Sequence, residues 1–391
     1  MKLRIIYVAP VSNDEINRLW GVRLDAPAVR NKVLGVCHAL KLSGAAPVIV
    51  STVVPSRVRQ LFQPARVHKA GEIDVVEAFT FGRRVWKRLI VGLSLLVYAM
   101  RSIRSEDRVI LYNFFPEYTL VALYLRLVGL PAIIDIEDAP RTDEDGLRGF
   151  SNRVSFSVLR RICASKYITA SASIGRSLRL EEFLPVYGVS SYLAANYETK
   201  RGFVQEDVRV LFGGGIHPET GRELFLDAIK LLSKRETGAR FEFVVSGRFD
   251  EDHLSKAAAK INRSATVSLS LRPNLPLDEY RALATSMDIG LSLKLSVSQI
   301  GVTTFPSKII EIAAMGMLVC ATAVGDVPLL FNAKNAIVLK SEDPAELASA
   351  LVWAATHRDD ARRLAAEGRK TVLRDCSSEV VGRKVIDFVF E

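Results

Sequence analysis

The segment from Phe305 to Val319 places a lysine and a glutamate at a spacing that could hold a nucleotide. Lys308 and Glu311 stand three residues apart, on one face of the helix predicted for Lys308–Met315. A carboxylate there can hold ribose hydroxyls, and an ammonium beside it can hold phosphate. Taken as a bare pair, a lysine and a glutamate at this spacing are more typical of a surface salt bridge.

Three consecutive glycines form a second candidate. Gly213–Gly215 follow the predicted strand Val208–Phe212 and precede the predicted helix Gly221–Leu232. Glycine lets backbone N–H groups approach an anion closely, so the run predicts a phosphate-binding turn. An ordinary tight turn fits the run equally well. The glycine run matches neither GxGxxG nor GxxxxGK[ST], which disfavours dinucleotide and Walker-type sites.

The elements that must position these residues alternate along the whole chain. Short runs that are apolar throughout, such as Ile5–Ala9 and Ala132–Ile136, are separated by amphipathic segments such as Ala28–Leu42, and the pattern restarts after Asn196–Val204. Apolar strands separated by helices predict a parallel sheet that is buried on both faces. We therefore expect an α/β fold with two doubly wound domains, whose ligands lie beyond the carboxyl ends of the strands.

Composition limits the class of protein. The chain has 391 residues, of which 49% are hydrophobic and 25% charged, so it can bury a full core and is neither disordered nor collagen-like. Its four cysteines lie far apart without a CxxC motif, which predicts buried reduced thiols and a cytoplasmic location. No signal peptide is expected, and the longest apolar stretch, Leu89–Met100, is too short to cross a bilayer.

Positive charge is concentrated in one half of the sequence. Residues 1–200 carry the whole formal net charge of +10, and residues 201–391 are balanced. The cluster Arg83–Arg88 precedes the apolar stretch Leu89–Met100, which Arg101 and Arg104 follow. This pattern is typical of a helix that lies on an anionic membrane, although a buried helix with solvated basic ends fits the apolar part as well. Nucleic acid is not expected as a partner, because no RNA-binding signature accompanies the charge.

Several segments together resemble one known family. Residues 305–319 (FPSKIIEIAAMGMLV) resemble the PSK-x-x-E-x-x-A-x-G-x-P-V donor segment of GT-B glycosyltransferases, particularly retaining family 4 of the surface polysaccharide type. Phe212–Gly221, Phe243–Arg248 and Ile133–Asp138 also resemble segments of that family. The resemblance implies two Rossmann-like domains that face a central cleft: an acceptor domain at 1–200, with helix 377–391 returning to it, and a nucleotide-sugar domain at 201–376.

The resemblance also implies roles for individual residues. Glu311 would bind the ribose hydroxyls, and the nucleobase would lie near Arg272 and Asn274. Glu137 would contact the donor sugar, and Asp138 would orient the acceptor hydroxyl, act as a base or cap the next turn. Gly21 would lie in the loop that faces both substrates. The remaining donor-binding positions are Gly214, Gly215, Thr303, Thr304 and Ser307.

The chain departs from the family pattern at three places. Thr303 stands where an E-x7-E pattern has its first glutamate, and Glu137 stands where many relatives have a histidine. Gly214 and Thr220 occupy the positions of the usual phosphate-binding arginine and lysine. Because the charge of the leaving diphosphate must still be offset, we expect Lys308 and Arg248 to supply the positive charge.

The resemblance implies retaining transfer of a sugar from a UDP- or GDP-linked donor, without a metal or another cofactor. The expected acceptor is a lipid-linked saccharide or an oligosaccharide used for cell-surface polysaccharide, on the inner face of the cell membrane. Two alternatives stay open: a sugar-nucleotide epimerase with the same fold, and a degenerate paralogue that only binds a partner.

Overall fold

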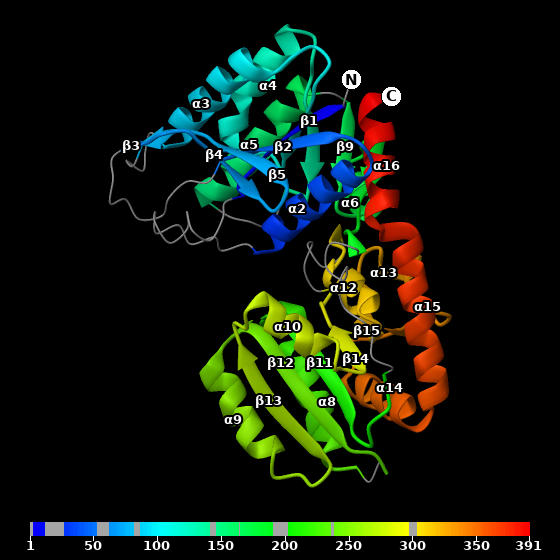
Figure 1. Cartoon of the computed structure of the whole chain (residues 1–391). Coiled ribbons are helices and arrows are strands. Elements are labelled where there is room, and N and C mark those ends of the chain that lie inside the picture. The colour runs from blue at the N-terminus through cyan, green and yellow to red at the C-terminus, as the bar shows by residue number, and fades with distance from the viewer. Residues whose placement is uncertain are drawn as a thin grey trace. The chain divides into compact units, whose positions relative to one another are not determined.

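The computed structural model describes residues 3–11, 27–52, 62–81, 87–140, 146–163, 165–190, 202–235, 238–296 and 303–391. The chain forms two compact units (Figure 1). Unit 1 comprises Met1–Tyr192 and Ser377–Glu391, and unit 2 comprises Leu193–Cys376.

Unit 1 is built on an eight-stranded sheet in the order β10-β9-β8-β7-β1-β2-β5-β4. All its neighbouring strands are parallel except β4 and β5, which form an antiparallel pair. The strands are β1 (Arg4–Ala9), β2 (Ala46–Ser51), β4 (Arg66–Ala70), β5 (Ile73–Glu77), β7 (Arg108–Tyr112), β8 (Ile133–Ile136), β9 (Lys166–Thr169) and β10 (Glu182–Pro185). A small antiparallel pair, β3 (Phe62–Gln63) and β6 (Thr80–Phe81), stands apart from this sheet.

Helices cover both faces of this sheet, because its central strands are apolar on both sides. One apolar core contains residues of α3 (Lys87–Ser102), α4 (Thr119–Leu127), α5 (Gly146–Ile162) and α6 (Ala172–Ser177). The other contains residues of α2 (Pro27–Leu42) and of the last helix, α16 (Ser378–Phe390). At Gly382 the two latter helices come so close that a Cβ atom would collide with the backbone oxygen of Ala39. The short helix η1 (Pro116–Tyr118) precedes α4.

Unit 2 contains a six-stranded parallel sheet in the order β13-β12-β11-β14-β15-β16. The strands are β11 (Val208–Ile216), β12 (Phe241–Phe249), β13 (Val267–Pro273), β14 (Ile289–Ser292), β15 (Leu318–Thr322) and β16 (Ile337–Leu339). The helices are η2 (Pro218–Thr220), α8 (Arg222–Leu232), α9 (Glu251–Ile261), α10 (Leu277–Ala284), α12 (Lys308–Ala314), α13 (Val327–Leu330), α14 (Pro344–Thr356) and α15 (Arg358–Cys376).

The expected α/β class with parallel sheets is confirmed in both units, and one local expectation is corrected. Helices α14 and α15 are separate because the backbone of His357 leaves the helical conformation between them. Strand β11 does not end at Phe212 but continues to Ile216, through the glycine run. The four cysteines are buried and free, as predicted.

Candidate nucleotide site and an ionic cluster in unit 1

The glycine run lies inside strand β11, so the expected turn at this position is wrong. Gly213, Gly214 and Gly215 pair with Ser246, Gly247 and Arg248 of β12. Gly214 has a φ of 109° and Gly247 a φ of 125°, which side chains other than glycine rarely adopt. A Cβ atom on Gly247 would also collide with the backbone oxygen of Gly214. The glycines therefore allow two strands to keep pairing closely at their carboxyl ends.

The space left by the missing side chain of Gly214 is filled by Lys308. A Cβ atom built on Gly214 would collide with Nζ of Lys308, and one built on Gly213 would lie 3.7 Å from the same atom. The ammonium also lies 5.9 Å from the ring centroid of Tyr280, in a cation–π contact. The structure thus brings together Lys308 and the glycines, which the sequence separates by more than ninety residues.

Glu311 lies one helical turn after Lys308, and the two do not form the salt bridge that their spacing alone would favour. Within the described ranges, neither side chain takes part in an ion pair of 4.0 Å or less. Burial lowers the pKa of Lys308, and the nearby Glu311 opposes this shift. Burial raises the pKa of Glu311, while Lys308 and Arg281 act in the opposite direction. An anion at Lys308 would therefore meet an ammonium that forms no ion pair with a carboxylate among the described residues.

Three further candidates gather at the carboxyl edge of the same sheet. Arg248 is exposed near the end of β12, opposite Gly215. Arg272 is exposed on β13, and the N–H of Asn274 donates a hydrogen bond of 3.1 Å to the backbone oxygen of Gly247. Asn274 has a φ of 48°, which ends β13 and turns the chain toward α10. Exposed cations thus lie at the ends of β12, which pairs with β11, and of β13, the next strand in the sheet.

The other predicted donor-binding residues are only partly described. Thr303 is buried, Thr304 half-buried and Ser307 exposed, directly before α12. Gly21 lies outside the described residues. The roles of all four residues stay predictions.

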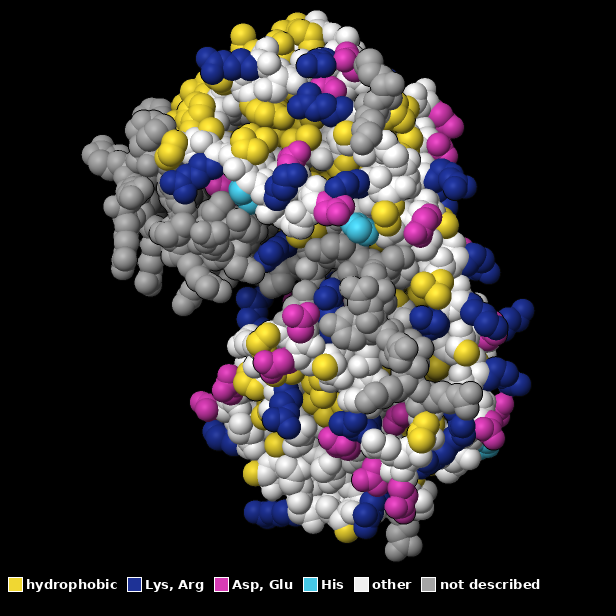
Figure 2. Space-filling model, viewed as in Figure 1, with side chains coloured by type: hydrophobic (Ala, Val, Ile, Leu, Met, Phe, Trp, Pro, Cys, Tyr) yellow, Lys and Arg dark blue, Asp and Glu magenta, His cyan; other side chains and the backbone are white. Residues whose placement is uncertain are grey.

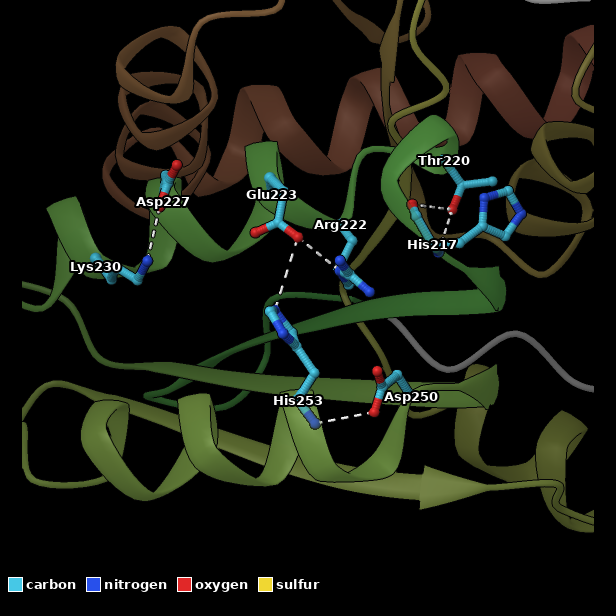
Figure 3. A network of polar contacts seen from close by, with 8 residues as sticks. All are labelled: His217, Thr220, Arg222, Glu223, Asp227, Lys230, Asp250 and His253. Atoms are coloured by element: carbon cyan, nitrogen blue, oxygen red, sulfur yellow. Dashed lines mark hydrogen bonds and ion pairs between the residues drawn. The ribbon is translucent and has the colours of Figure 1, made fainter.

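The turn between β11 and α8 is held by its own residues and offers no free cation (Figure 3). The hydroxyl of Thr220 accepts a hydrogen bond of 2.9 Å from the N–H of His217 and donates to the backbone oxygens of Gly215 and His217. Arg222, which follows it, pairs with Glu223 at 2.7 Å. Thr220 therefore shapes the turn, and Lys308 supplies the positive charge that faces Gly214.

In unit 1, Glu137 belongs to an ionic cluster at the carboxyl ends of β1, β7 and β8. Nζ of Lys32 lies 2.8 Å from Oδ1 of Asp135 and 2.5 Å from Oε2 of Glu137. The hydroxyl of Tyr7 donates to the other oxygen of Asp135. The N–H of Glu137 donates a hydrogen bond of 2.8 Å to Oδ1 of Asn113. One ammonium therefore bridges two carboxylates, one of which is the predicted sugar-contacting residue.

Burial and charge act together in this cluster. Burial disfavours the ammonium of Lys32, but Asp135 and Glu137 outweigh it and raise its pKa above the ordinary value. Burial raises the pKa of Glu137, with a contribution from Asp135, and Lys32 opposes the shift. Lys32 therefore stays charged. Asp138, by contrast, is exposed at the end of β8.

Lys32, Tyr280 and Arg281 were missed by the sequence analysis. Tyr280 and Arg281 could have been found, because they lie in the first helix after β13, and residues that follow a parallel strand gather at the ligand-binding edge. Lys32 lies inside helix α2 beside the buried Val33 and Leu34, and no local signal distinguishes it from a surface lysine.

Comparison with known proteins finds a family model that matches part of the second unit. Residues 207–357 match the family model Glycosyl transferases group 1. The matched segment contains Gly213–Gly215, Arg248, Tyr280, Lys308 and Glu311. No curated protein matches the chain.

Similar solved structures cover both units. Trehalose-phosphate synthase (UDP-forming) from Burkholderia xenovorans is similar with a TM-score of 0.68 and 13% identity, over 99% of this chain and 100% of that one. Anabaena HepE in complex with UDP has a TM-score of 0.63 and 12% identity over 99% of each chain. Sucrose-phosphate synthase from Thermosynechococcus elongatus has a TM-score of 0.66 and 12% identity, over 99% of this chain and 98% of that one. The predicted GT-B fold is confirmed.

The lowered pKa of Lys308 predicts how the binding of a diphosphate at this position would depend on pH. A diphosphate beside Lys308 would need the charged ammonium, so its affinity is expected to be highest below the pKa of Lys308 and to be lost as the pH rises through it. Because burial places this pKa below the ordinary value of about 10.4, the loss begins below that pH and approaches tenfold per pH unit. Calorimetric titration of UDP at a series of pH values measures it.

The matched control is Lys308→Arg, whose guanidinium stays charged over this range. The ionisation of UDP itself is common to both proteins and cancels in the ratio of their affinities. An equal pH dependence in the two proteins would contradict a role for Lys308 in binding phosphate.

Proposed function

We propose that the protein is a glycosyltransferase that moves a sugar from a nucleotide-sugar to an acceptor. The observation that carries the proposal is the Lys308 ammonium lying against the glycine strand, with Glu311 one turn further along the same helix. Both residues lie in the segment that matches the glycosyltransferase family model. The proposed nucleotide is UDP, because HepE of the same fold was solved in complex with it.

Each residue of the candidate site has a place in the proposed reaction. Lys308 and Arg248 offset the charge that develops on the leaving diphosphate, and Gly214 and Gly215 let it approach the backbone. Glu311 accepts hydrogen bonds from the ribose hydroxyls, as its position after PSK suggests. The nucleobase lies near Arg272 and Asn274. The contacts of the diphosphate and donor sugar are completed by Thr303, Thr304, Ser307 and Gly21.

Cationic side chains at the strand ends support a reaction that needs no metal. Retention at the anomeric carbon is proposed on a different ground, the resemblance to family 4. In unit 1, Glu137 is proposed to contact the donor sugar and Asp138 to orient the acceptor hydroxyl. Glu137 can hold a fixed position because Lys32 binds its carboxylate.

The proposed acceptor is a lipid-linked saccharide or oligosaccharide used in surface polysaccharide synthesis, with the protein in the cytoplasm at an anionic membrane. The positive charge confined to residues 1–200 supports this partner. Among the described residues, no helix is both apolar enough and long enough to cross a membrane. Sugar phosphates are the competing acceptors, since a similar synthase was solved with glucose-6-phosphate.

A two-stage experiment tests the proposal. Thermal shift with UDP-, GDP- and ADP-sugars identifies the donor, since a ligand that binds only the folded state raises its melting temperature. Release of the nucleoside diphosphate is then measured with a lipid-linked saccharide, with glucose-6-phosphate and without acceptor. Acceptor-dependent release with the saccharide supports transfer of a sugar from the nucleotide-sugar to that acceptor.

The other outcomes identify what is wrong. Conversion of one nucleotide-sugar into another without release of diphosphate indicates an epimerase. Binding without turnover for any acceptor indicates a binding paralogue. Release that depends on glucose-6-phosphate keeps the glycosyltransferase but rejects the proposed acceptor.

A further inference from the structure

Helix α3 of unit 1 exposes an apolar stripe instead of a polar outer face. Val91, Leu95 and Ala99 are buried against the sheet, as in any amphipathic helix. The opposite side, however, carries four exposed hydrophobic residues at helical spacing: Leu89, Leu93, Val97 and Met100. A helix that met only water on this side would carry polar residues there.

The two neighbouring helices continue this apolar surface. Leu123 and Leu127 are exposed on α4, with Leu127 at 85%, and Val128 follows directly after them. Phe150, at 62%, and Val154 are exposed on α5. Of the fifteen large hydrophobic residues found exposed in the described part of the chain, nine belong to this surface. A concentration of this kind marks an interaction site.

The three helices form one layer, so their outer faces point the same way. α3, α4 and α5 all contribute to the single apolar core on one face of the sheet, and α4 contacts both of the others. In Figure 2, hydrophobic side chains gather over α3 and α4 with basic side chains between them. We call the outer faces of α3, α4 and α5 the basic–apolar face.

The charge on these helices has one sign. Their sequences contain eight lysine or arginine residues and no aspartate or glutamate. Arg126 and Arg160 donate hydrogen bonds to backbone oxygens, of Arg161 and Leu178 among others, so these contacts leave their charge in place. Arg101 and Arg161 are exposed. Arg88 differs from these arginines because it pairs with a carboxylate: its Nε lies 4.0 Å from Oε2 of Glu117.

We propose that the basic–apolar face docks on the surface of an anionic lipid bilayer. Apolar side chains would enter the boundary between headgroups and acyl chains, and the arginines would contact the anionic headgroups. A second copy of this chain is disfavoured as the occupant, because two such faces would bring arginines against arginines. The proposal names the surface that the membrane part of the proposed function requires, and it does not depend on sugar transfer.

Sedimentation with lipid vesicles tests the proposal on the full chain without donor or acceptor. The full chain binds vesicles in which about a third of the lipid is phosphatidylglycerol, and binds pure phosphatidylcholine vesicles at least tenfold more weakly. Leu127→Gln combined with Phe150→Gln lowers binding to the anionic vesicles at least tenfold, because both side chains are exposed and apolar. Arg101→Gln combined with Arg161→Gln lowers it about tenfold, and raised salt weakens the binding of the unmodified chain.

Matched controls come from exposed residues of unit 2. Leu329→Gln with Leu373→Gln, and Lys256→Gln with Lys334→Gln, make the same chemical changes elsewhere and leave vesicle binding unchanged. Equal binding to neutral and anionic vesicles, or an effect of the controls as large as that of the test variants, overturns the proposal. So does self-association in solution that the Leu127 and Phe150 changes abolish, since it would make a second copy the occupant. A protein that does not bind vesicles but still releases diphosphate would contradict the docking proposal and leave the proposed sugar transfer standing. The two failures are therefore distinguishable.

Discussion

Replacing Lys308 with methionine is expected to lower kcat/KM for the nucleotide-sugar by about a thousandfold, while the protein stays folded. Methionine is similar in length but carries no charge. The ammonium lies against Gly214, and none of the described carboxylates lies within 4.0 Å of it. Its loss therefore removes the positive charge that would stabilise the leaving diphosphate. The release of nucleoside diphosphate at limiting donor concentration measures the effect.

Two further variants make this prediction specific. Lys308→Arg keeps the charge but changes its geometry, so it should retain more activity than Lys308→Met. Lys334→Met removes an exposed lysine from the same unit and should leave kcat/KM unchanged. A Lys308→Met protein with full activity would mean that the diphosphate binds elsewhere. Gly214 and Gly215 would then not belong to the diphosphate site.

The architecture could be predicted from the sequence because its strands are continuously apolar. Val109–Tyr112 and Leu318–Ala321 have no polar residue that would fit an exposed sheet face, and both form buried parallel strands. The hairpin of β4 and β5 was not predicted. Its strand Arg66–Ala70 is mostly exposed and carries a histidine and two basic residues, so its pattern is that of a loop.

The sequence predicts how residues of the candidate site are arranged only where a recognisable motif contains them. The PSK segment places Lys308 and Glu311 on one helix face by local spacing. That Gly213–Gly215 form a strand instead of a turn depends on pairing with Ser246–Arg248, more than thirty residues away, which no local pattern encodes. The helix of Tyr280 could be placed at this edge because it follows β13, but the contact of Tyr280 with Lys308 depends on packing that no local pattern encodes.

Lys32, the buried cation of unit 1, shows most clearly what the sequence alone does not predict. Lys32 binds Asp135, which lies 103 residues further along the chain. A helical lysine is normally exposed, and only the fold reveals that two carboxylates meet it here. The sequence analysis found one of these carboxylates, Glu137, through the resemblance of Ile133–Asp138 to a segment of the family.

Replacing Lys32 with methionine is expected to destabilise unit 1 by about 3 kcal/mol near pH 8. The side chain of Lys32 is 10% exposed and that of Asp135 only 1%, so removing the lysine leaves the Asp135 carboxylate beside that of Glu137 with almost no access to water. Guanidinium unfolding followed by the fluorescence of a probe on unit 1 measures the change. Lys41→Met is the matched control, because Lys41 lies on the same helix but pairs with the exposed Glu72, and its loss should change stability little.

The destabilisation should also depend on pH in one direction. Without the ammonium, burial and the neighbouring Asp135 raise the pKa of Glu137 unopposed by Lys32, so the variant recovers stability as the pH falls and loses it as the pH rises. The difference between the unmodified protein and Lys32→Met should therefore be larger at pH 8 than at pH 5. Adding Glu137→Gln to Lys32→Met removes one of the two charges and should restore part of the loss. A difference that is constant with pH and unaffected by Glu137→Gln would show that Lys32 acts through packing of its aliphatic chain and not through charge.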